Sequence, residues 1–180
     1  VCSSDLPRGS GVLNTALFSS EKASWNTPEN IVRLVRALGP VVLDPCSNAD
    51  SIVGAASFYD GSSLEMCGLS NSWAVGDGLV YVNPPYGAEI AKWLQKCVTE
   101  AENGVEIVAL LPARTDTKWW QDYVTKATCV LFWKGRLQFL GAASSAPFPS
   151  AIVYWGCAPD QFAAVFGNYG WVVRGMEIAQ

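Results

Sequence analysis

Short apolar runs alternate with amphipathic stretches along most of the chain. Five apolar runs have the length and composition of buried strands: 41–43, 79–82, 106–111, 129–133 and 151–155. Helical spacing of apolar residues predicts helices over about 28–38 and 88–102, and a further helix that begins near Thr115-Asp116. Strands and helices that alternate in this way predict an α/β fold with a mostly parallel sheet flanked by helices.

Two segments need separate treatment. Residues 1–10 resemble a translated adapter end followed by a protease-tag remnant, so we exclude them and expect a single domain over 11–180. The segment 137–159 carries no charge, which raises the question of a membrane span. It contains Pro147 and Pro149 and lacks continuous apolarity, so we interpret it as two strands and a loop inside a core.

Polar motifs follow the first two predicted strands. Asp44-Pro45 follows the run 41–43, and Asn83-Pro84-Pro85-Tyr86 follows the run 79–82. Ligands of open α/β sheets bind at the carboxyl ends of the strands. The sequence therefore marks both motifs as candidates for a functional site.

Composition excludes several classes of protein and site. Half of the 180 residues are apolar and 16% are charged, which excludes a disordered chain. The absence of histidine excludes Ser-His-Asp and Cys-His catalysis and every metal site that needs a histidine. The net charge of −4 weighs against a protein that holds duplex DNA by charge alone. Beyond Cys2, five cysteines remain without a C-x-x-C pair, so we expect buried free thiols and neither a zinc site nor a disulfide framework.

The tetrapeptide Asn83-Pro84-Pro85-Tyr86 suggests a specific chemistry. Two consecutive prolines stiffen the backbone, and the Asn side-chain oxygen and the Pro84 carbonyl become two acceptors on one frame. Two such acceptors suit the two hydrogens of a planar amino group, and the Tyr86 ring suits stacking on a base. This pattern favours attack by an sp² amino nitrogen on an activated methyl group, without a histidine. The alternative is a structural Pro-Pro turn.

The chain resembles the phage-type DNA N-6-adenine methyltransferases, which depend on S-adenosylmethionine. Asn-Pro-Pro-Tyr is the most specific shared motif, and the similarity follows the expected order over about residues 24–155. The other matching stretches are Trp25-Asn26-Thr27-Pro28, Leu43-Asp44-Pro45, Gly68-Leu69 with Trp73, 110–117 with Trp119-Trp120, Gly135-Arg136-Leu137 with Phe139, Pro147-Phe148 and Ser150. The resemblance implies a Rossmann-like methyltransferase fold.

The resemblance also implies roles for individual residues. Asn83 and Pro84 would accept the adenine amino hydrogens, Pro85 would stiffen the turn, and Tyr86 would stack on the flipped base. The implied cofactor-binding residues are Trp25, Thr27, Pro28, Asp44, Pro45, Asp60 and Asn83. The implied substrate-binding residues are Arg114, Thr115 and Arg136. Most have a plain structural alternative: a turn at Asp44, a helix cap at Thr27-Pro28, a loop carboxylate at Asp60, and local ion pairs at Arg114 and Arg136.

Several features depart from the wider pattern. The glycine-rich cofactor loop of many methyltransferases is absent, which argues against the related protein-glutamine enzymes, and Cys67 stands where a polar or acidic residue is expected. The implied function is methyl transfer from S-adenosylmethionine to adenine N6 in phage or mobile-element DNA, in the cytoplasm of a bacterial host. Two alternatives remain: the same transfer on RNA or a protein side chain, or an inactive relative that binds cofactor or DNA.

Overall fold

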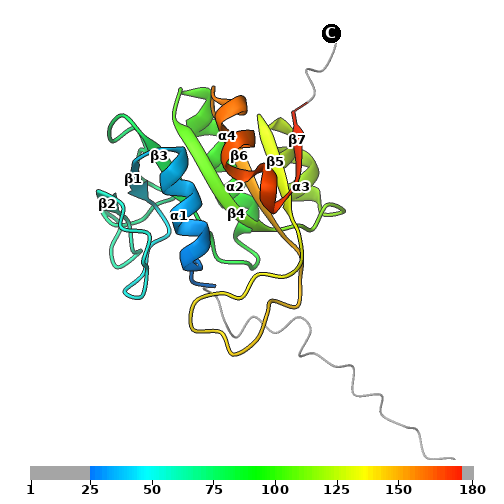
Figure 1. Cartoon of the computed structure of the whole chain (residues 1–180). Helices are drawn as coiled ribbons and strands as arrows, with labels where there is room; N and C mark the ends of the chain where they lie inside the picture. Colours follow the sequence, from blue (N-terminus) through cyan, green and yellow to red (C-terminus); the bar gives the residue numbers. More distant parts are fainter. Residues whose placement is uncertain (1–24, 176–180) are drawn as a thin grey trace, which may run out of the picture.

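The computed structural model describes residues 25–175, so the interpretation of residues 1–10 lies outside the described residues. The helices are α1 (Glu29–Leu38), α2 (Ile90–Glu102), α3 (Lys118–Tyr123) and α4 (Pro159–Phe166), with 3-10 turns at Val124–Lys126 and Gly167–Tyr169. The strands are β1 (Val41–Asp44), β2 (Ser57–Phe58), β3 (Leu79–Val82), β4 (Glu106–Pro112), β5 (Cys129–Trp133), β6 (Ser150–Trp155) and β7 (Gly170–Arg174). Figure 1 shows their arrangement around one sheet.

The seven strands pair in the order β2-β1-β3-β4-β6-β5-β7. The strands β2, β1, β3 and β4 pair in parallel, whereas β6 is antiparallel to both of its neighbours and β7 is antiparallel to β5. The sheet is mixed, and the expectation of a mostly parallel sheet was wrong. The physical reason is that the loop 134–149 joins β5 to β6 and the two strands pair with each other. Parallel pairing of consecutive strands needs a crossover connection, usually a helix, and no helix lies between β5 and β6.

The order of the strands reverses between β1 and β3. From β1 the chain first adds β2 on one side and then returns to place β3 on the other side. A reversal of this kind opens a crevice at the carboxyl ends of the two strands, where α/β proteins bind ligands. Asp44 ends β1 and Asn83 directly follows β3, so both polar motifs lie at this crevice.

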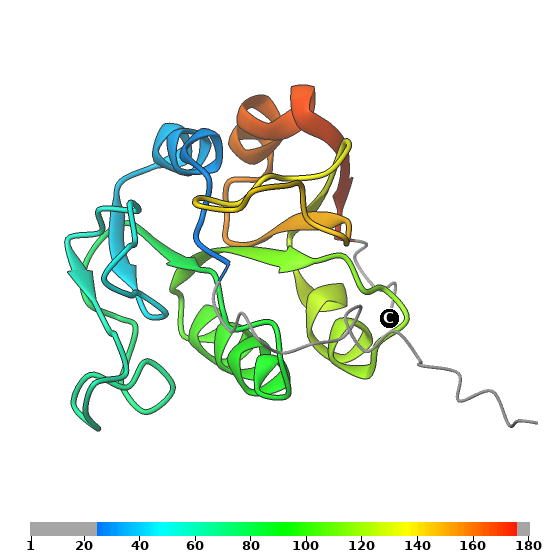
Figure 2. The same ribbon diagram turned by 90° about the horizontal axis from the view of Figure 1, so that it is seen from below.

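Two pairs of helices cover the two faces of the sheet. The apolar residues of α1 and α4 pack on one face together with Tyr81, Leu110 and Ile152, and those of α2 and α3 pack on the other with Val80, Ala109 and Val153. Figure 2 shows this three-layer arrangement along the sheet. The face occupied by each side chain follows from the alternation along the strands.

The apolar runs predicted the strands better than the connections between them. The strands β3 and β5 have the predicted bounds, and β1, β4 and β6 extend by one residue each. The segment 137–159 holds one complete strand, β6, rather than two. Leu137 and Phe139 are buried from within a loop, so their apolarity reflects burial without strand pairing. The elements β2, α4 and β7 were not predicted.

Other expectations concern the cysteines and a membrane span. The five described cysteines are free thiols, but only Cys97 and Cys129 are buried and Cys157 is exposed, so the expectation of uniform burial was wrong. Trp120 is buried whereas its neighbour Trp119 is half-buried, as adjacent positions on a helix require. No helix within residues 25–175 is long and apolar enough to cross a membrane.

Candidate active site

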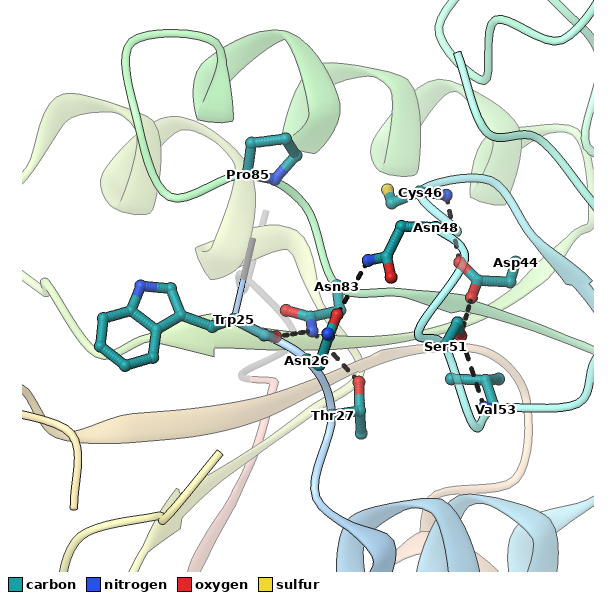
Figure 3. Close-up of a pocket in the computed structure, with 10 residues that line it drawn as sticks. All are labelled: Trp25, Asn26, Thr27, Asp44, Cys46, Asn48, Ser51, Val53, Asn83 and Pro85. Atoms are coloured by element: carbon teal, nitrogen blue, oxygen red, sulfur yellow. Dashed lines mark hydrogen bonds between the residues drawn. The ribbon is translucent and has the colours of Figure 1, made fainter. Parts of the chain in front are cut away.

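A polar pocket lies at the ends of β1 and β3, beside the segment that leads into α1 (Figure 3). The pocket brings together three parts of the chain that are distant in sequence, and it occupies the point where the order of strands reverses. The residues that line it are Trp25, Asn26, Thr27, Asp44, Cys46, Asn48, Ser51, Val53, Asn83 and Pro85.

The amide of Asn83 is held by two acceptors. Its Nδ2 donates to the Trp25 carbonyl (2.5 Å) and to Thr27 Oγ1 (3.1 Å). Its Oδ1 is buried and has no hydrogen-bond partner among the described residues. A buried carbonyl oxygen without a donor is unfavourable by about 1–3 kcal/mol, so this atom is suited to accept a hydrogen bond from a ligand.

The two prolines after Asn83 keep the backbone of this turn stiff. Pro84 is buried, Pro85 lines the pocket, and the turn closes with a hydrogen bond from Gly87 N to the Pro85 carbonyl (3.0 Å). Within residues 25–175 the Pro84 carbonyl accepts no backbone hydrogen bond. A second acceptor, which has no backbone donor among the described residues, therefore directly follows Asn83 in the chain.

Tyr86 belongs to a cluster of four aromatic side chains, which we call the aromatic cluster: Trp25, Tyr86, Phe139 and Phe148. The Tyr86 ring makes edge contacts with Phe139 and Phe148, at centroid distances of 6.2 and 5.7 Å. Its hydroxyl donates to the Leu110 carbonyl (3.1 Å), and burial raises the pKa of Tyr86 well above its usual value. Tyr86 is therefore a fixed, neutral aromatic group rather than a proton donor or acceptor.

Asp44 contributes a buried carboxylate to the pocket. It is 4% exposed and accepts hydrogen bonds from Cys46 N and Ser51 Oγ, both at 3.1 Å. Desolvation by burial raises the pKa of Asp44 to about 6, although these hydrogen bonds oppose the shift. The bond from Cys46 N shows that Asp44 also forms a turn. Asp44 therefore has the structural role given as its alternative and also lines the pocket. No described cation forms an ion pair with Asp44, so the site suits a positively charged ligand group.

A second hollow continues from this pocket and shares Asp44, Asn48 and Ser51 with it. Asp60 and the exposed ring of Phe58 line its far part. A hydrogen bond from the Ser62 side chain, together with one from Ser62 N (2.9 Å), lowers the pKa of Asp60. We call these two adjoining hollows, which share the buried Asp44 carboxylate, the groove.

The remaining predicted residues lie in several positions. Pro28 and Pro45 are buried and line neither hollow. Thr27 lines the pocket but does not cap α1: the helix begins at Glu29 after Pro28, and the Thr27 hydroxyl bonds Tyr81 and Asn83 instead. The structural alternative of a helix cap at Thr27 was therefore wrong.

The three predicted substrate residues lie near the site but outside it. Arg114, Thr115 and Arg136 are exposed and line neither hollow. Arg114 follows β4 and Arg136 follows β5, and these strands both run antiparallel to β6, so both arginines lie at the sheet edge that carries Asn83. Their alternative role in local ion pairs has no support among the described residues, which include no ion pair with either arginine.

The sequence reasoning missed several pocket residues. Asn26 and Asn48 form a side-chain hydrogen bond across the pocket (Asn48 Nδ2 to Asn26 Oδ1, 2.8 Å), and Ser51 holds Asp44. Cys46, Asn48 and Ser51 follow Asp44 within seven residues, and this proximity was the available signal. In a segment rich in Ser, Gly and Asn, however, nothing else in the sequence separates a site residue from a loop residue.

A seven-stranded α/β sheet with flanking helices and a pocket at the strand reversal is consistent with a methyltransferase fold. The model of the family described as DNA N-6-adenine-methyltransferase (Dam) matches residues 14–151. The chain belongs to this family, which confirms the resemblance stated from the sequence, and the family implies adenine N6 methyltransferase activity on DNA. Searches of curated proteins and of solved structures find no significant match.

Proposed function

We propose that this chain transfers a methyl group from S-adenosylmethionine to the N6 amino group of adenine in DNA. We also propose that it is phage- or prophage-encoded and acts in the cytoplasm of a bacterial host. The observation that carries the first proposal is the buried Asn83 Oδ1, which has no hydrogen-bond partner among residues 25–175. The Pro84 carbonyl, which accepts no backbone hydrogen bond within these residues, follows it on a stiff turn. Two preorganised acceptors match the two hydrogens of an exocyclic amino group.

The polar lining of the groove supports S-adenosylmethionine as the cofactor. The buried Asp44 carboxylate would bind the cationic amino group of the cofactor, and Asn26, Asn48 and Ser51 offer polar contacts around it. Asp60 and Phe58, farther along the groove, would contact the ribose and the planar base. The bound cofactor would supply an electrophilic methyl group on sulfur, and the carbon–sulfur bond would break as the new carbon–nitrogen bond forms.

The residues of this chain then have defined tasks. Asn83 Oδ1 and the Pro84 carbonyl would each accept one amino hydrogen, which orients the nitrogen lone pair and stabilises the positive charge that develops during attack. Tyr86, anchored through its hydroxyl to Leu110, would stack on the adenine after the base leaves the duplex. The extra proton would leave the nitrogen for solvent after transfer, so no strong base is needed.

The test is incubation of the chain with labelled S-adenosylmethionine and unmethylated DNA, followed by nucleoside analysis. We expect N6-methyladenine, and we expect Asn83→Ala to lower the rate at least 10²-fold while cofactor affinity is retained. Asn103→Ala, an exposed asparagine after α2, is the matched control and should leave the rate unchanged. Label found in RNA or protein instead would mean that the substrate is not DNA. Cofactor binding without methyl transfer to DNA, RNA or protein would indicate an inactive relative.

A further inference from the structure

Behind Asn83 lies a short chain of buried polar groups. Thr27 Oγ1 accepts from Asn83 Nδ2 (3.1 Å) and forms a second hydrogen bond with the Tyr81 hydroxyl (2.9 Å). Tyr81 is 1% exposed and Thr27 is 5% exposed, so neither group exchanges its partner for bulk water. Tyr81 lies on β3 and Thr27 precedes α1, so the chain connects the sheet to the helix that covers it.

An asparagine amide has two orientations that exchange its oxygen and nitrogen positions. The Trp25 carbonyl selects between them because it only accepts hydrogen bonds, and the atom of Asn83 that faces it at 2.5 Å must therefore be the NH₂ nitrogen. The rotated amide would place two carbonyl oxygens against each other. Thr27 satisfies the second hydrogen of the same NH₂ group, and Tyr81 holds the Thr27 hydroxyl in place.

We propose that Thr27 and Tyr81 are positioning residues, which together with the Trp25 carbonyl lock the Asn83 amide with its oxygen toward the substrate amino group. The inference rests on the proposed function for the identity of that substrate. It also predicts that this pocket favours an amide at position 83. An ionised carboxylate at position 83 would place one of its oxygens against the Trp25 carbonyl oxygen, and two acceptors repel each other. Only the protonated acid supplies both a donor and an acceptor.

The first test removes the lock while Asn83 stays in place. Thr27→Val keeps the shape of the side chain and removes the hydroxyl, and we expect kcat to fall about tenfold while the DNA KM and cofactor Kd change less than twofold. Thr27→Ser should restore most of the loss, and Tyr81→Phe should lose a few-fold. Tyr169→Phe, at an exposed tyrosine, is the matched control. A folded Thr27→Val protein with unchanged kcat would overturn the proposal.

The second test has one readout that needs no turnover. In Asn83→Asp, a ¹³C NMR titration of the introduced carboxyl in the cofactor-free protein should give a pKa well above the ordinary value for aspartic acid, and methyl transfer should rise as the pH falls toward that value. Asp44, Cys46, Tyr81 and Tyr86 also face this region, so the activity is read as the ratio to wild type at each pH. An ordinary pKa at position 83 would refute the lock. If the wild type methylates no DNA, the proposed function is wrong. The proposal that the amide of residue 83 is held in one orientation is then still tested by the titration.

Discussion

At the scale of single residues, Asp44 shows how a buried carboxyl lowers stability. Its carboxyl is 4% exposed, has two hydrogen-bond donors and has no ionic partner among the described residues, so burial raises its pKa to about 6 from 3.8. Because the folded state binds this proton more tightly than the unfolded chain, the ionised form is unfavourable at neutral pH. The unfavourable term is fully present above about pH 6 and disappears as the pH falls toward 3.8.

Asp44→Asn should therefore be more stable than the wild type at pH 7. A shift from 3.8 to about 6 corresponds to at most about 3 kcal/mol, and the loss of one accepted hydrogen bond reduces the gain. Chemical denaturation at pH 7 and near pH 4 measures the difference in the free energy of unfolding between the two proteins, and this difference should approach zero at the lower pH. Asp77→Asn, in an exposed loop, should change the free energy of unfolding by less than about 0.5 kcal/mol. A destabilised Asp44→Asn protein at pH 7 would contradict the assignment.

Cofactor affinity should also depend on the ionisation of Asp44. The ionised carboxyl lowers the stability of the fold but should strengthen cofactor binding. If Asp44 binds the cationic amino group of S-adenosylmethionine, only the ionised carboxyl serves, and the affinity should fall as the pH drops below about 6. Well below that value the loss approaches about tenfold per pH unit. Calorimetric titration between pH 5 and 8 measures it. A pH-independent Kd would separate Asp44 from the amino group.

At the scale of elements, α2 supports the site through a loop. Glu100 on α2 forms an ion pair with Lys96 and accepts from Trp73 N (3.3 Å), and Trp73 Nε1 in turn donates to the Gly68 carbonyl (2.8 Å). Gly68 lies so close to β1 that an added Cβ would be 2.1 Å from the Pro45 carbonyl. The helix therefore holds the loop that presses on the end of β1, next to Asp44.

Glu100→Ala should lower the free energy of unfolding by about 2–3 kcal/mol, because it leaves Lys96 largely buried without its partner and frees the Trp73 N–H. Asp122→Ala is the matched control, since Lys118 and Asp122 have the same spacing but are 88% and 40% exposed. It should lose less than about 0.5 kcal/mol. Equal losses measured by urea denaturation would show that the buried contacts of Glu100 contribute nothing extra.

The same elements show what sequence can and cannot predict. Apolar runs bounded by turn residues predicted β3 and β5 with their observed bounds, because β3 is buried on both faces and every residue of β5 is buried or half-buried, which leaves a continuous apolar signal. The direction of β6 and the strand order depend on pairings between distant segments, and β2 is two exposed residues long. Asn83 was found from its motif, whereas its unpartnered oxygen depends on Trp25 and Thr27, which are more than fifty residues away.

At the scale of the whole molecule, the net charge of −4 hides a strong asymmetry. Residues 25–111 hold four basic and ten acidic side chains, whereas residues 112–175 hold six basic and three acidic ones. Three of the basic side chains, Arg114, Lys134 and Arg136, are exposed after β4 and β5, at the sheet edge that carries Asn83. The acidic balance of the whole chain is therefore compatible with a local basic face beside the pocket.

If DNA lies along this edge, Arg114→Ala and Arg136→Ala should each weaken DNA binding roughly 3- to 10-fold at about 0.1 M salt. Each should also reduce the slope of log K against log salt by about 0.7–0.9, the amount for one lost phosphate contact. Arg33→Ala, on the exposed side of α1, removes the same charge from the acidic part of the chain and should change affinity less than twofold. Fluorescence anisotropy with labelled DNA at several salt concentrations measures all three. Equal effects at Arg33 and Arg136 would mean that net charge alone governs binding, and the edge beside Asn83 would lose its assignment as the DNA face.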